Sequence, residues 1–309
     1  MKHDARVEQW RSQSAVTQVG RFSPAIDALP SDLRGLRDVS RQLVAHYMFG
    51  GDEAGGPVSG PRLVEVDTRY ADAMLGRLLE LGAPSLARER PLAERIVGCC
   101  RDFTVLFVAM ARHKGIPARM RVGYATYFQP GWHVDHVIAE VWDGGEGRWR
   151  LVEPEIGDDF VPADGAPFEP LDVPPDRFVT GPRAWLAARS GRLDPERCVV
   201  TPDLPIPYTR SWLSLRHHVV QDLAALCKAE MLLWDEWGML REDDPLREAS
   251  TLDRLSAALA DPACSVAEVA SWARQDGLRV PPTVTSYSPA HPGPLEVDVS
   301  RVLAGMMGA

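Results

Sequence analysis

One continuous stretch, residues 98–153, constrains the fold of this chain more than any other part. It opens with an apolar run at helical spacing that ends at Lys114-Gly115-Ile116-Pro117, where glycine and proline interrupt helical backbone. We therefore predict a helix from Cys100 to His113. Three strand-like runs follow, which are ARMRVGYATYF (118–128), HVIAEVW (136–142) and RWRLVE (148–153). The stretch predicts one helix followed by three strands, of which the last two form a hairpin.

The predicted hairpin brings a histidine and a carboxylate together. The residues between its strands, Asp143-Gly144-Gly145-Glu146-Gly147, are a strong turn signal. With a four-residue loop, Trp142 pairs with Gly147, and His136 lies directly opposite Glu153. Opposed residues have Cβ atoms roughly 5 Å apart, so an imidazole–carboxylate hydrogen bond is within reach. A five-residue loop would shift the register by one residue and place Glu153 on the other face of the sheet.

Cys100 is a candidate nucleophile because of its position at the start of the predicted helix. Unpaired backbone N–H groups and the helix dipole favour negative charge there. We therefore expect a lowered thiol pKa and an accessible thiolate. The neighbouring Cys99 is interpreted as structural, because buried cysteines are usually inert. Adjacent cysteines lack the C-x-x-C spacing of zinc and redox sites, so neither kind of site is predicted.

Helical periodicity organises the rest of the chain. Helices are predicted over residues 31–48, 67–82, 182–190, 213–237, 246–260 and 265–276. Asp67 or Thr68 is expected to cap the second of these helices, and Gly82 to end it. The remainder of segment 154–210 is rich in proline and is predicted to be irregular, and the tail from Pro281 is predicted to be extended.

The order of these motifs resembles the transglutaminase-like superfamily. The shared features are Gly-x-Cys at a helix start, an apolar helix, Gly-Ile-Pro-Ala-Arg, His-x-x-x-Glu-Val and W-x-x-V-acid-Pro, which lie within residues 95–155. Weaker similarities to bacterial transglutaminase-domain proteins are LVAHYMFGG (43–51), RPLAERIVGCCRDF (90–103), DPERCV (194–199) and DLAALCKAEMLLWDEWG (222–238). The resemblance implies an α+β fold with a papain-like core, in which the nucleophile helix packs on an antiparallel sheet, and additional N- and C-terminal helices.

The resemblance also implies a catalytic triad. Cys100 matches the nucleophile, His136 the base and Glu153 the third member, where the family usually has aspartate. Such a triad forms a thioester acyl-enzyme. Three other carboxylates are alternatives for orienting the histidine, namely Asp135, Asp158 and Asp159. The other residues expected to line the site are Trp132, His133, Arg101, Asp102 and, again, Asp135.

Composition argues against several kinds of partner. A net charge of -9 and a pI near 5.4 argue against nucleic acid, which binds basic surfaces. No run of about 18 apolar residues occurs, so no membrane span is predicted, and the N-terminus lacks the apolar stretch of a signal peptide. Five cysteines in a chain of 309 residues do not resemble a disulfide framework. We therefore expect a cytoplasmic protein without a cofactor or metal ion.

His217-His218 are interpreted as a solvent-exposed helix start.

Three segments and three functions are expected. The segments are an N-terminal helical part (1–66), a catalytic core (67–160) and an irregular cover with C-terminal helices (161–309), packed as one compact unit. The first function is hydrolysis of an amide, peptide or isopeptide bond. The second is amide synthesis, in which an amine receives the acyl group in a small-molecule pathway. Both require a small-molecule or peptide substrate with an acyl or amide group. The third is a non-catalytic binding or scaffold protein on the same fold, for which glutamate at position 153 is the hint.

Overall fold

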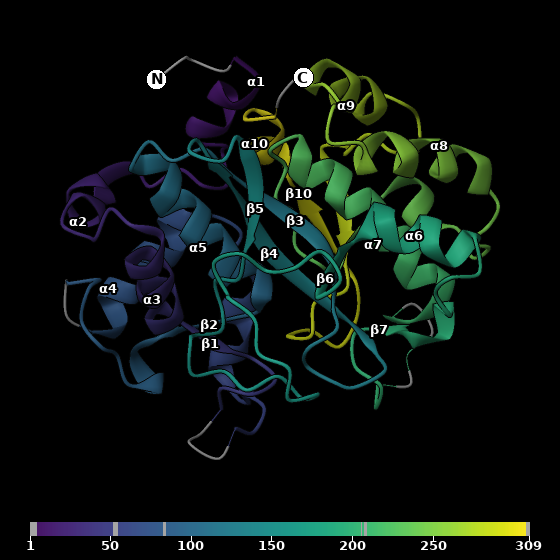
Figure 1. The fold of residues 1–309 in the computed structure, drawn as a ribbon. Coiled ribbons are helices and arrows are strands. Elements are labelled where there is room, and N and C mark those ends of the chain that lie inside the picture. Colours follow the sequence, from purple (N-terminus) through teal and green to yellow (C-terminus); the bar gives the residue numbers. More distant parts are fainter. Residues whose placement is uncertain (1–4, 52–54, 83–84, 205, 207–208, 307–309) are drawn as a thin grey trace.

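A five-stranded sheet lies at the centre of the molecule (Figure 1). The computed structural model describes residues 5–51, 55–82, 85–204, 206 and 209–306. The strand order is β5-β4-β3-β6 with antiparallel neighbours, and β7 pairs in parallel with the start of β4. The strands are β3 (Ala118–Ala125), β4 (His133–Asp143), β5 (Arg148–Val152), β6 (Phe178–Thr180) and β7 (Cys198–Val199). The predicted α+β class is confirmed.

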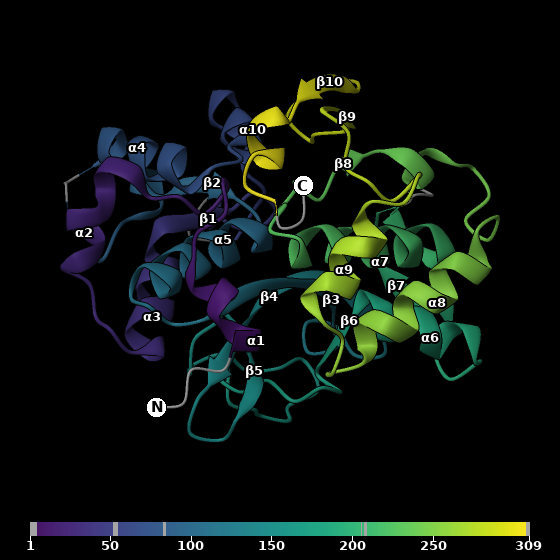
Figure 2. The same ribbon diagram turned by 90° about the horizontal axis from the view of Figure 1, so that it is seen from above.

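Two long helices cover the same face of this sheet. α5 (Cys100–His113) packs on β3 and β4, and α7 (Ser211–Leu226) packs on β3. Figure 2, viewed from above, shows the two helices on one side of the strands. Their apolar side chains join Val137 in the main hydrophobic cluster. On the other face, Ile138 belongs to a smaller cluster with residues of the irregular segment after the hairpin, including Ile156. The sheet is therefore buried on both faces.

Helix α5 begins and ends where the sequence predicts. It spans Cys100–His113, and Gly115 follows with a φ of 76°, a left-handed conformation that favours glycine. Burial along α5 extends around the whole helix from Cys100 to Arg112, so it lies in the interior of the molecule. The site at its first turn is therefore held by packing on several sides.

The first long helix is shorter than predicted. α3 (Leu33–Leu43) is capped by Asp32, whose carboxylate accepts the N–H of Gly35 at 2.9 Å. The helix was predicted to continue to Met48, but residues Val44–His46 form strand β1 instead. β1 pairs in parallel with β2 (Ile96–Gly98), and this tertiary pairing overrides the helical periodicity. As a result, β1 lies beside the residues that lead into Cys100.

The second helix begins later than predicted. α4 (Ala71–Leu81) follows a 3₁₀ segment over Pro61–Asp67, and neither Asp67 nor Thr68 caps it. The Asp67 carboxylate instead accepts the indole N–H of Trp234 at 3.2 Å, so a long-range contact replaces the local cap. Gly82 ends α4, as predicted.

The long C-terminal helix was also predicted too long. α7 ends at Leu226 instead of Trp237, because Lys228 has a φ of 63° and the chain leaves the helical path there. The segment that follows runs irregularly along the start of α5, where Arg101 binds the carbonyls of Glu230 and Met231. These tertiary contacts are not visible in local periodicity.

Shorter elements complete the fold. The remaining helices are α1 (Ala5–Glu8), α2 (Ser23–Asp27), α6 (Gly181–Arg189), α8 (Ala249–Ala260), α9 (Val266–Ala273) and α10 (Ser300–Leu303). The tail forms part of a small sheet, which contains β8 (Asp235–Glu236), β9 (Thr283–Ser286) and β10 (Leu295–Asp298). The main hydrophobic cluster contains residues from all three predicted segments. The boundaries between those segments remain a prediction. In the described part of the chain, no helix is long and apolar enough to cross a membrane.

Candidate active site

The first turn of α5 packs closely against the residues just before Cys100. Asp102 folds back, and its carboxylate accepts the backbone N–H of Cys99 at 2.8 Å. A Cβ on Gly98 would lie 2.6 Å from a carboxylate oxygen of Asp102, so this position has room only for glycine. Cys99 takes the N-cap position, in keeping with its structural interpretation, and Cys100 is the first helical residue. Both cysteines are buried.

Arg101 and Asp102 hold the helix start instead of lining the site. The two side chains pair at 2.8 Å and are buried. The Arg101 guanidinium also donates to the carbonyls of Met231 at 3.0 Å, Arg69 at 2.8 Å and Glu230 at 2.6 Å. All these contacts point into the protein, which corrects the expectation that this pair lines the site.

The β4–β5 hairpin has a register two residues away from the predicted one. Asp143 pairs with Arg148, whereas the prediction paired Trp142 with Gly147. The Asp143 carboxylate accepts the N–H of Gly145 at 2.7 Å, which moves the start of the loop past Asp143. The predicted pairing is therefore wrong. Because the displacement is an even number of residues, each side chain keeps its predicted face of the sheet.

His136 and Glu153 form a buried hydrogen-bonded pair. Nε2 of His136 lies 2.7 Å from Oε2 of Glu153, and the two side chains are 2% and 0% exposed. The same oxygen accepts the phenol O–H of Tyr127, and Oε1 accepts the backbone N–H of Glu155 at 3.0 Å. Both carboxylate oxygens therefore have partners that fix their position. The sequence gives no signal for Tyr127, which lies just past the end of β3.

Each member of this pair shifts the pKa of the other. Burial lowers the pKa of His136, but the Glu153 carboxylate outweighs this effect, and the pKa of the imidazole is raised. Burial raises the pKa of Glu153, but His136 and Tyr127 outweigh it, and the pKa of this carboxyl is lowered. The pair thus favours imidazolium with carboxylate. With Nε2–H donating to Glu153, Nδ1 of the neutral ring is the basic nitrogen.

Thr104 ties the start of α5 to the strand that carries His136. Its hydroxyl oxygen lies 3.0 Å from the carbonyl oxygen of Cys100 and 2.9 Å from that of Val137. Val137 directly follows His136 in β4. A single buried hydroxyl therefore bridges the backbone of Cys100 to the residue next to the histidine, and the structure gathers Cys100, His136 and Glu153 in one region.

The pKa of Cys100 is raised, which corrects the expectation from its helix-start position. The hydrogen bond with the Cys99 thiol raises the pKa of Cys100 most, burial raises it further, and the carboxylates of Asp135 and Glu155 add to the effect. The thiol therefore keeps its proton at rest. Chemistry at this sulfur needs a base that takes the proton as the sulfur attacks, and an oriented imidazole is such a base.

Asp135 does not orient His136, although it precedes it. Its carboxylate lies 2.7 Å from Nε2 of His218 on α7. Burial raises the pKa of Asp135, but His218 outweighs this effect, and the pKa of the carboxyl is lowered. The ring of Tyr124 stacks on His218 with centroids 4.2 Å apart. His218 is 3% exposed, so its interpretation as part of a solvent-exposed helix start is wrong. A second histidine–carboxylate pair thus lies beside the first.

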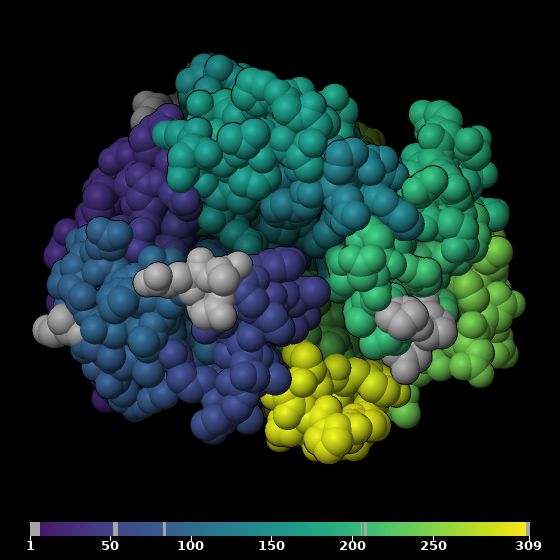
Figure 3. Space-filling model, turned by 90° about the horizontal axis from the view of Figure 1, so that it is seen from below, coloured from purple at the N-terminus to yellow at the C-terminus, as the bar shows by residue number. Residues whose placement is uncertain are grey.

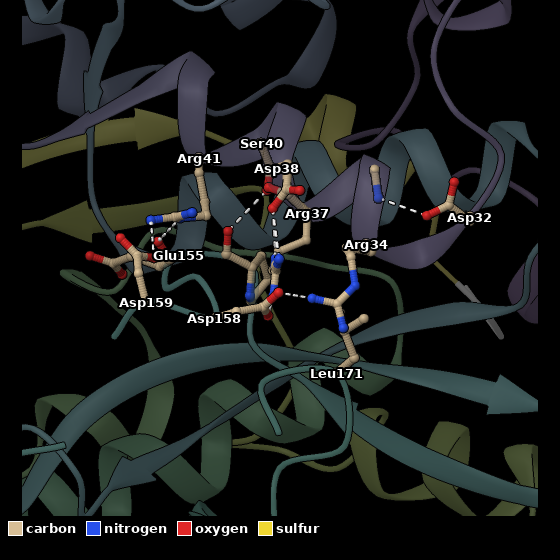
Figure 4. Close-up of polar contacts among 12 residues, drawn as sticks. Asp32, Arg34, Arg37, Asp38, Ser40, Arg41, Glu155, Asp158, Asp159 and Leu171 are labelled. Carbon is tan, nitrogen blue, oxygen red and sulfur yellow. Dashed lines mark hydrogen bonds and ion pairs between the residues drawn. The ribbon is translucent and has the colours of Figure 1, made fainter. Parts of the chain in front are cut away.

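Asp158 and Asp159 are bound to α3. Figure 4 shows Asp158 beside Arg34 and Arg37, and the Arg37–Asp158 contact measures 2.6 Å. Asp159 lies 3.3 Å from Nη2 of Arg41. These contacts fasten the segment after the hairpin to α3. Of the carboxylates considered for orienting the histidine, Glu153 is the one that contacts it.

Trp132 and His133 lie at the beginning of β4, beside β7. The guanidinium of Arg197 covers the Trp132 ring at 4.8 Å from its centroid. His133 pairs with Cys198 in the strand register, and burial lowers the pKa of its imidazole. Both side chains are partly exposed. Their expected role in lining the site stays a prediction.

A pocket of about 310 Å³ opens beside this region. It is bounded by α3, β1, the first turn of α5 and the turn after β5, which contribute Arg41, His46, Phe103 and Glu155. Figure 3, viewed from below, shows the surface hollowed between the purple-blue segment near residue 50 and the teal segment near residue 150. Phe103 lies three residues after Cys100 and therefore on the same side of the helix.

Comparison with known proteins agrees with this geometry. Residues 84–154 match the family model described as the Transglutaminase-like superfamily, and this range contains Cys100, His136 and Glu153. This stretch is therefore similar to a transglutaminase-like core. The core combines α5 with the β3–β4–β5 meander, the order of elements that its motifs predicted. The similarity is confined to this stretch of the chain.

Similarity to solved structures is weak. A crystal structure described as "a Putative Cysteine Protease from Cytophaga hutchinsonii" aligns at 18% identity with a TM-score of 0.33. The alignment covers 53% of this chain and 46% of that one, so this chain spans about half of the protein it matches. A likeness this weak carries no argument about function. No curated protein matches the chain.

Proposed function

We propose that this chain is a cysteine-dependent enzyme that forms a thioester acyl-enzyme on Cys100 and passes the acyl group to water or to an amine. The observation that supports it most is the buried 2.7 Å contact between Nε2 of His136 and Oε2 of Glu153. A carboxylate in that position fixes the tautomer of a catalytic imidazole and stabilises the imidazolium that forms during reaction.

The proposed reaction begins with an amide, ester or thioester carbonyl. The sulfur of Cys100 bonds to the carbonyl carbon while Nδ1 of His136 takes the thiol proton, and the carbonyl electron pair moves to oxygen. The backbone N–H of Cys100 and a second donor hold this oxyanion. When the bond to the leaving group breaks, His136 gives the same proton to the leaving amine or alcohol.

The second half of the proposed reaction mirrors the first. Water or an amine attacks the thioester carbon and loses a proton to His136, and the sulfur of Cys100 leaves and recovers that proton. Attack by water gives hydrolysis, and attack by an amine gives acyl transfer. Both outcomes use the same acyl-enzyme, so hydrolase and amide synthase are two forms of one proposal.

The glutamate at position 153 does not favour the scaffold alternative. A scaffold would have no use for a carboxylate that is fully buried, paired with His136, and held by Tyr127 and the backbone of Glu155. Burying a carboxylate costs free energy unless every oxygen has a partner, and all of the partners here hold it against the histidine. This arrangement supports an enzyme.

Alkylation with iodoacetamide tests the proposed nucleophile. Burial and neighbouring acidic groups raise the pKa of Cys264 to about 11, so this partly exposed cysteine is an internal reference thiol. We expect Cys100 to be carbamidomethylated faster than Cys264, and His136→Ala to remove the advantage. Peptide mass spectrometry measures both rates in one sample. Equal rates for the two cysteines, unchanged in His136→Ala, would contradict the proposal.

An acyl-enzyme gives the second test. Incubation with p-nitrophenyl acetate followed by acid quenching should leave one acetyl group on the peptide that contains Cys100, visible by mass. Cys100→Ala should carry none, and Cys264→Ala is the matched control that should still be acetylated. Adding glycinamide to the reaction then distinguishes the acceptors, because N-acetylglycinamide forms by amine transfer and acetate by hydrolysis.

A further inference from the structure

The pocket beside the proposed site is lined by two arginines. It has a volume of about 310 Å³ and lies between α3, β1 and the turn after β5. Its polar residues are Arg41, Gln42, His46, Arg95 and Glu155, and its apolar residues include Val44, Ala45, Phe49, Leu92 and Phe103. The wall of the pocket therefore carries both charged and apolar side chains.

Three connections place this pocket next to the catalytic groups. Phe103 lies on the first turn of α5, on the side of Cys100. The backbone N–H of Glu155 donates to Glu153, the partner of His136. His46 pairs in the β1–β2 register with Gly98, two residues before Cys100. The pocket therefore lies close to the proposed catalytic groups.

Arg95 has no ion-pair partner within 4 Å among the described residues, although the charge of Glu89 attracts its guanidinium from farther away. Its Nε donates to the carbonyl of Arg90 at 2.9 Å, Nη1 to the carbonyl of Arg41 at 3.2 Å and Nη2 to Oε1 of Gln42 at 2.8 Å. All three acceptors are uncharged, so these bonds fix the guanidinium without an ion pair. A guanidinium has five N–H donors, which leaves two for a ligand.

The charge of Arg41 is only weakly neutralised by its neighbours. Its Nε donates to the carbonyl of Glu155 at 3.3 Å, and Nη2 lies 3.3 Å from Asp159, whose side chain is 82% exposed. Exposed ion pairs of this kind contribute little. Figure 4 shows Arg41 on α3 reaching toward the segment that carries Glu155. The Nη1 donors of Arg41 have no acceptor among the described residues.

The other titratable groups of the pocket do not offset the two arginines. Burial, with a smaller effect of His136, lowers the pKa of His46 to about 4, so this ring is neutral. Its Nδ1 accepts the N–H of Met48 at 3.2 Å, which assigns the ring proton to Nε2. Burial raises the pKa of Glu155 to about 7, so much of this carboxyl is uncharged near neutral pH. Cations thus outnumber anions in the pocket.

We propose that this pocket binds a carboxylate of the substrate, held by Arg41 and Arg95, with methylene groups between that carboxylate and the reacting carbonyl. Arginine pairs with carboxylates through two parallel N–H groups, which suits the free donors found here. The proposal rests on the proposed function, since it takes the reacting carbonyl to lie at Cys100. It defines the substrate class as an amide or ester whose acyl group ends in a carboxylate.

Affinity labels of graded length test this pocket. The probes are N-iodoacetyl derivatives of glycine, β-alanine and 4-aminobutyrate, each compared with its uncharged primary amide. At one length, we expect the acid to alkylate Cys100 about tenfold faster than its amide, since a charge-assisted hydrogen bond is a difference of that order. Arg95→Gln and Arg41→Gln should each reduce the ratio of the two rates. Arg254→Gln, an exposed arginine on α8, should leave the ratio unchanged.

The outcomes separate the two proposals. Equal rates for acid and amide at every length, with labelling still dependent on His136, would overturn the pocket assignment alone. An acid preference that persists while labelling is independent of His136 would overturn the proposed function and leave the pocket standing. Faster labelling by N-iodoacetyl-ethylenediamine would mean that Glu155 binds a cation, which also overturns the assignment. Because Arg95 has structural hydrogen bonds, Arg41→Gln and melting curves of both variants distinguish lost binding from lost folding.

Discussion

His136 and Glu153 are hydrogen-bonded across the hairpin although they are not opposite each other. In the observed register, Val152 pairs with Ala139, so the position of Glu153 corresponds to Ile138, two residues from His136. The two side chains are therefore diagonal neighbours, whose Cα atoms lie farther apart than those of opposed residues, at roughly 7–8 Å. The additional methylene of glutamate helps to span this distance, and the resulting contact measures 2.7 Å.

Shortening or neutralising Glu153 should therefore impair the enzyme. We expect Glu153→Gln and Glu153→Asp each to lower kcat/KM about a hundredfold or more, which is the range that general acid–base catalysis contributes. Glutamine loses the charge that stabilises the imidazolium, and aspartate loses the reach. Glu155→Gln, two residues later, is the matched control and should reduce kcat/KM far less. Equal losses at positions 153 and 155 would show that the diagonal contact is not the functional one.

The pH profile should shift with the charge at Glu153. The carboxylate raises the pKa of His136 above its ordinary value of 6.5. Because the base must be unprotonated, kcat/KM should rise with pH along a limb centred above that value. In Glu153→Gln the raising influence is lost and burial still lowers the pKa of His136, so the limb should move to lower pH. A pH–rate profile of both proteins measures this, and a limb that stays in place would contradict the assignment of His136.

Tyr127 should act as a positioning residue. Its phenol is fully buried and donates to the Glu153 oxygen that also binds His136. Tyr127→Phe keeps the ring and removes this donor, which should lower the free energy of unfolding by about 1.5–3 kcal/mol, as for other hydrogen bonds to charged groups. We expect kcat to fall less than in Glu153→Gln, with KM nearly unchanged. Denaturant unfolding and steady-state kinetics check both, and Tyr287→Phe, at an exposed tyrosine, is the control.

Much of this site could be predicted from local sequence. The Gly98-Cys99-Cys100 start, the helix end at Gly115 and the face occupied by Glu153 all depend on neighbouring residues, and the structure agrees with them. The register was wrong because Asp143, predicted in the loop, is the last paired residue of β4. A two-residue error preserves the face of a strand, so the contact was still found.

Other features depend on contacts between distant segments. Residues 44–46 leave the helical path because β2 is available to pair with them, and α7 stops at Leu226 because the following chain binds Arg101. The pKa of Cys100 follows from burial and from the Cys99 thiol, which outweigh the helix-start position. The pairing of Asp135 with His218 joins residues that no local pattern connects.

Replacing Cys100 should remove activity and leave the fold intact. We expect Cys100→Ser to lose acyl transfer and to melt within a few degrees of the parent protein, since a hydroxyl differs little in size and a shift of 1 kcal/mol is about 2–4 °C in a chain this long. Cys99→Ser should keep activity, because its role is to cap the helix. A large drop in melting temperature for Cys100→Ser alone would indicate a structural cysteine instead.

Glu155 should make substrate binding depend on pH. The groups around its carboxyl come from four elements: Arg41 on α3, His46 on β1, Cys100 on α5, His136 on β4, and also Arg95 and Glu153. Burial outweighs the lowering influence of His136 and raises the pKa of Glu155 to about 7. Below that value the carboxyl is neutral and tolerates a substrate carboxylate beside it. Above that value it is negatively charged and repels the substrate.

For an acidic substrate, KM should therefore rise as the pH increases through about 7, while kcat follows His136. Glu155→Gln should remove this rise in KM, because the amide stays neutral at every pH. The primary amide of the same substrate is the matched control, and its KM should stay flat in both proteins. Steady-state kinetics across the pH range separates the two constants. A KM that is flat for the acid in the parent protein, or one that rises equally in Glu155→Gln, would contradict this role.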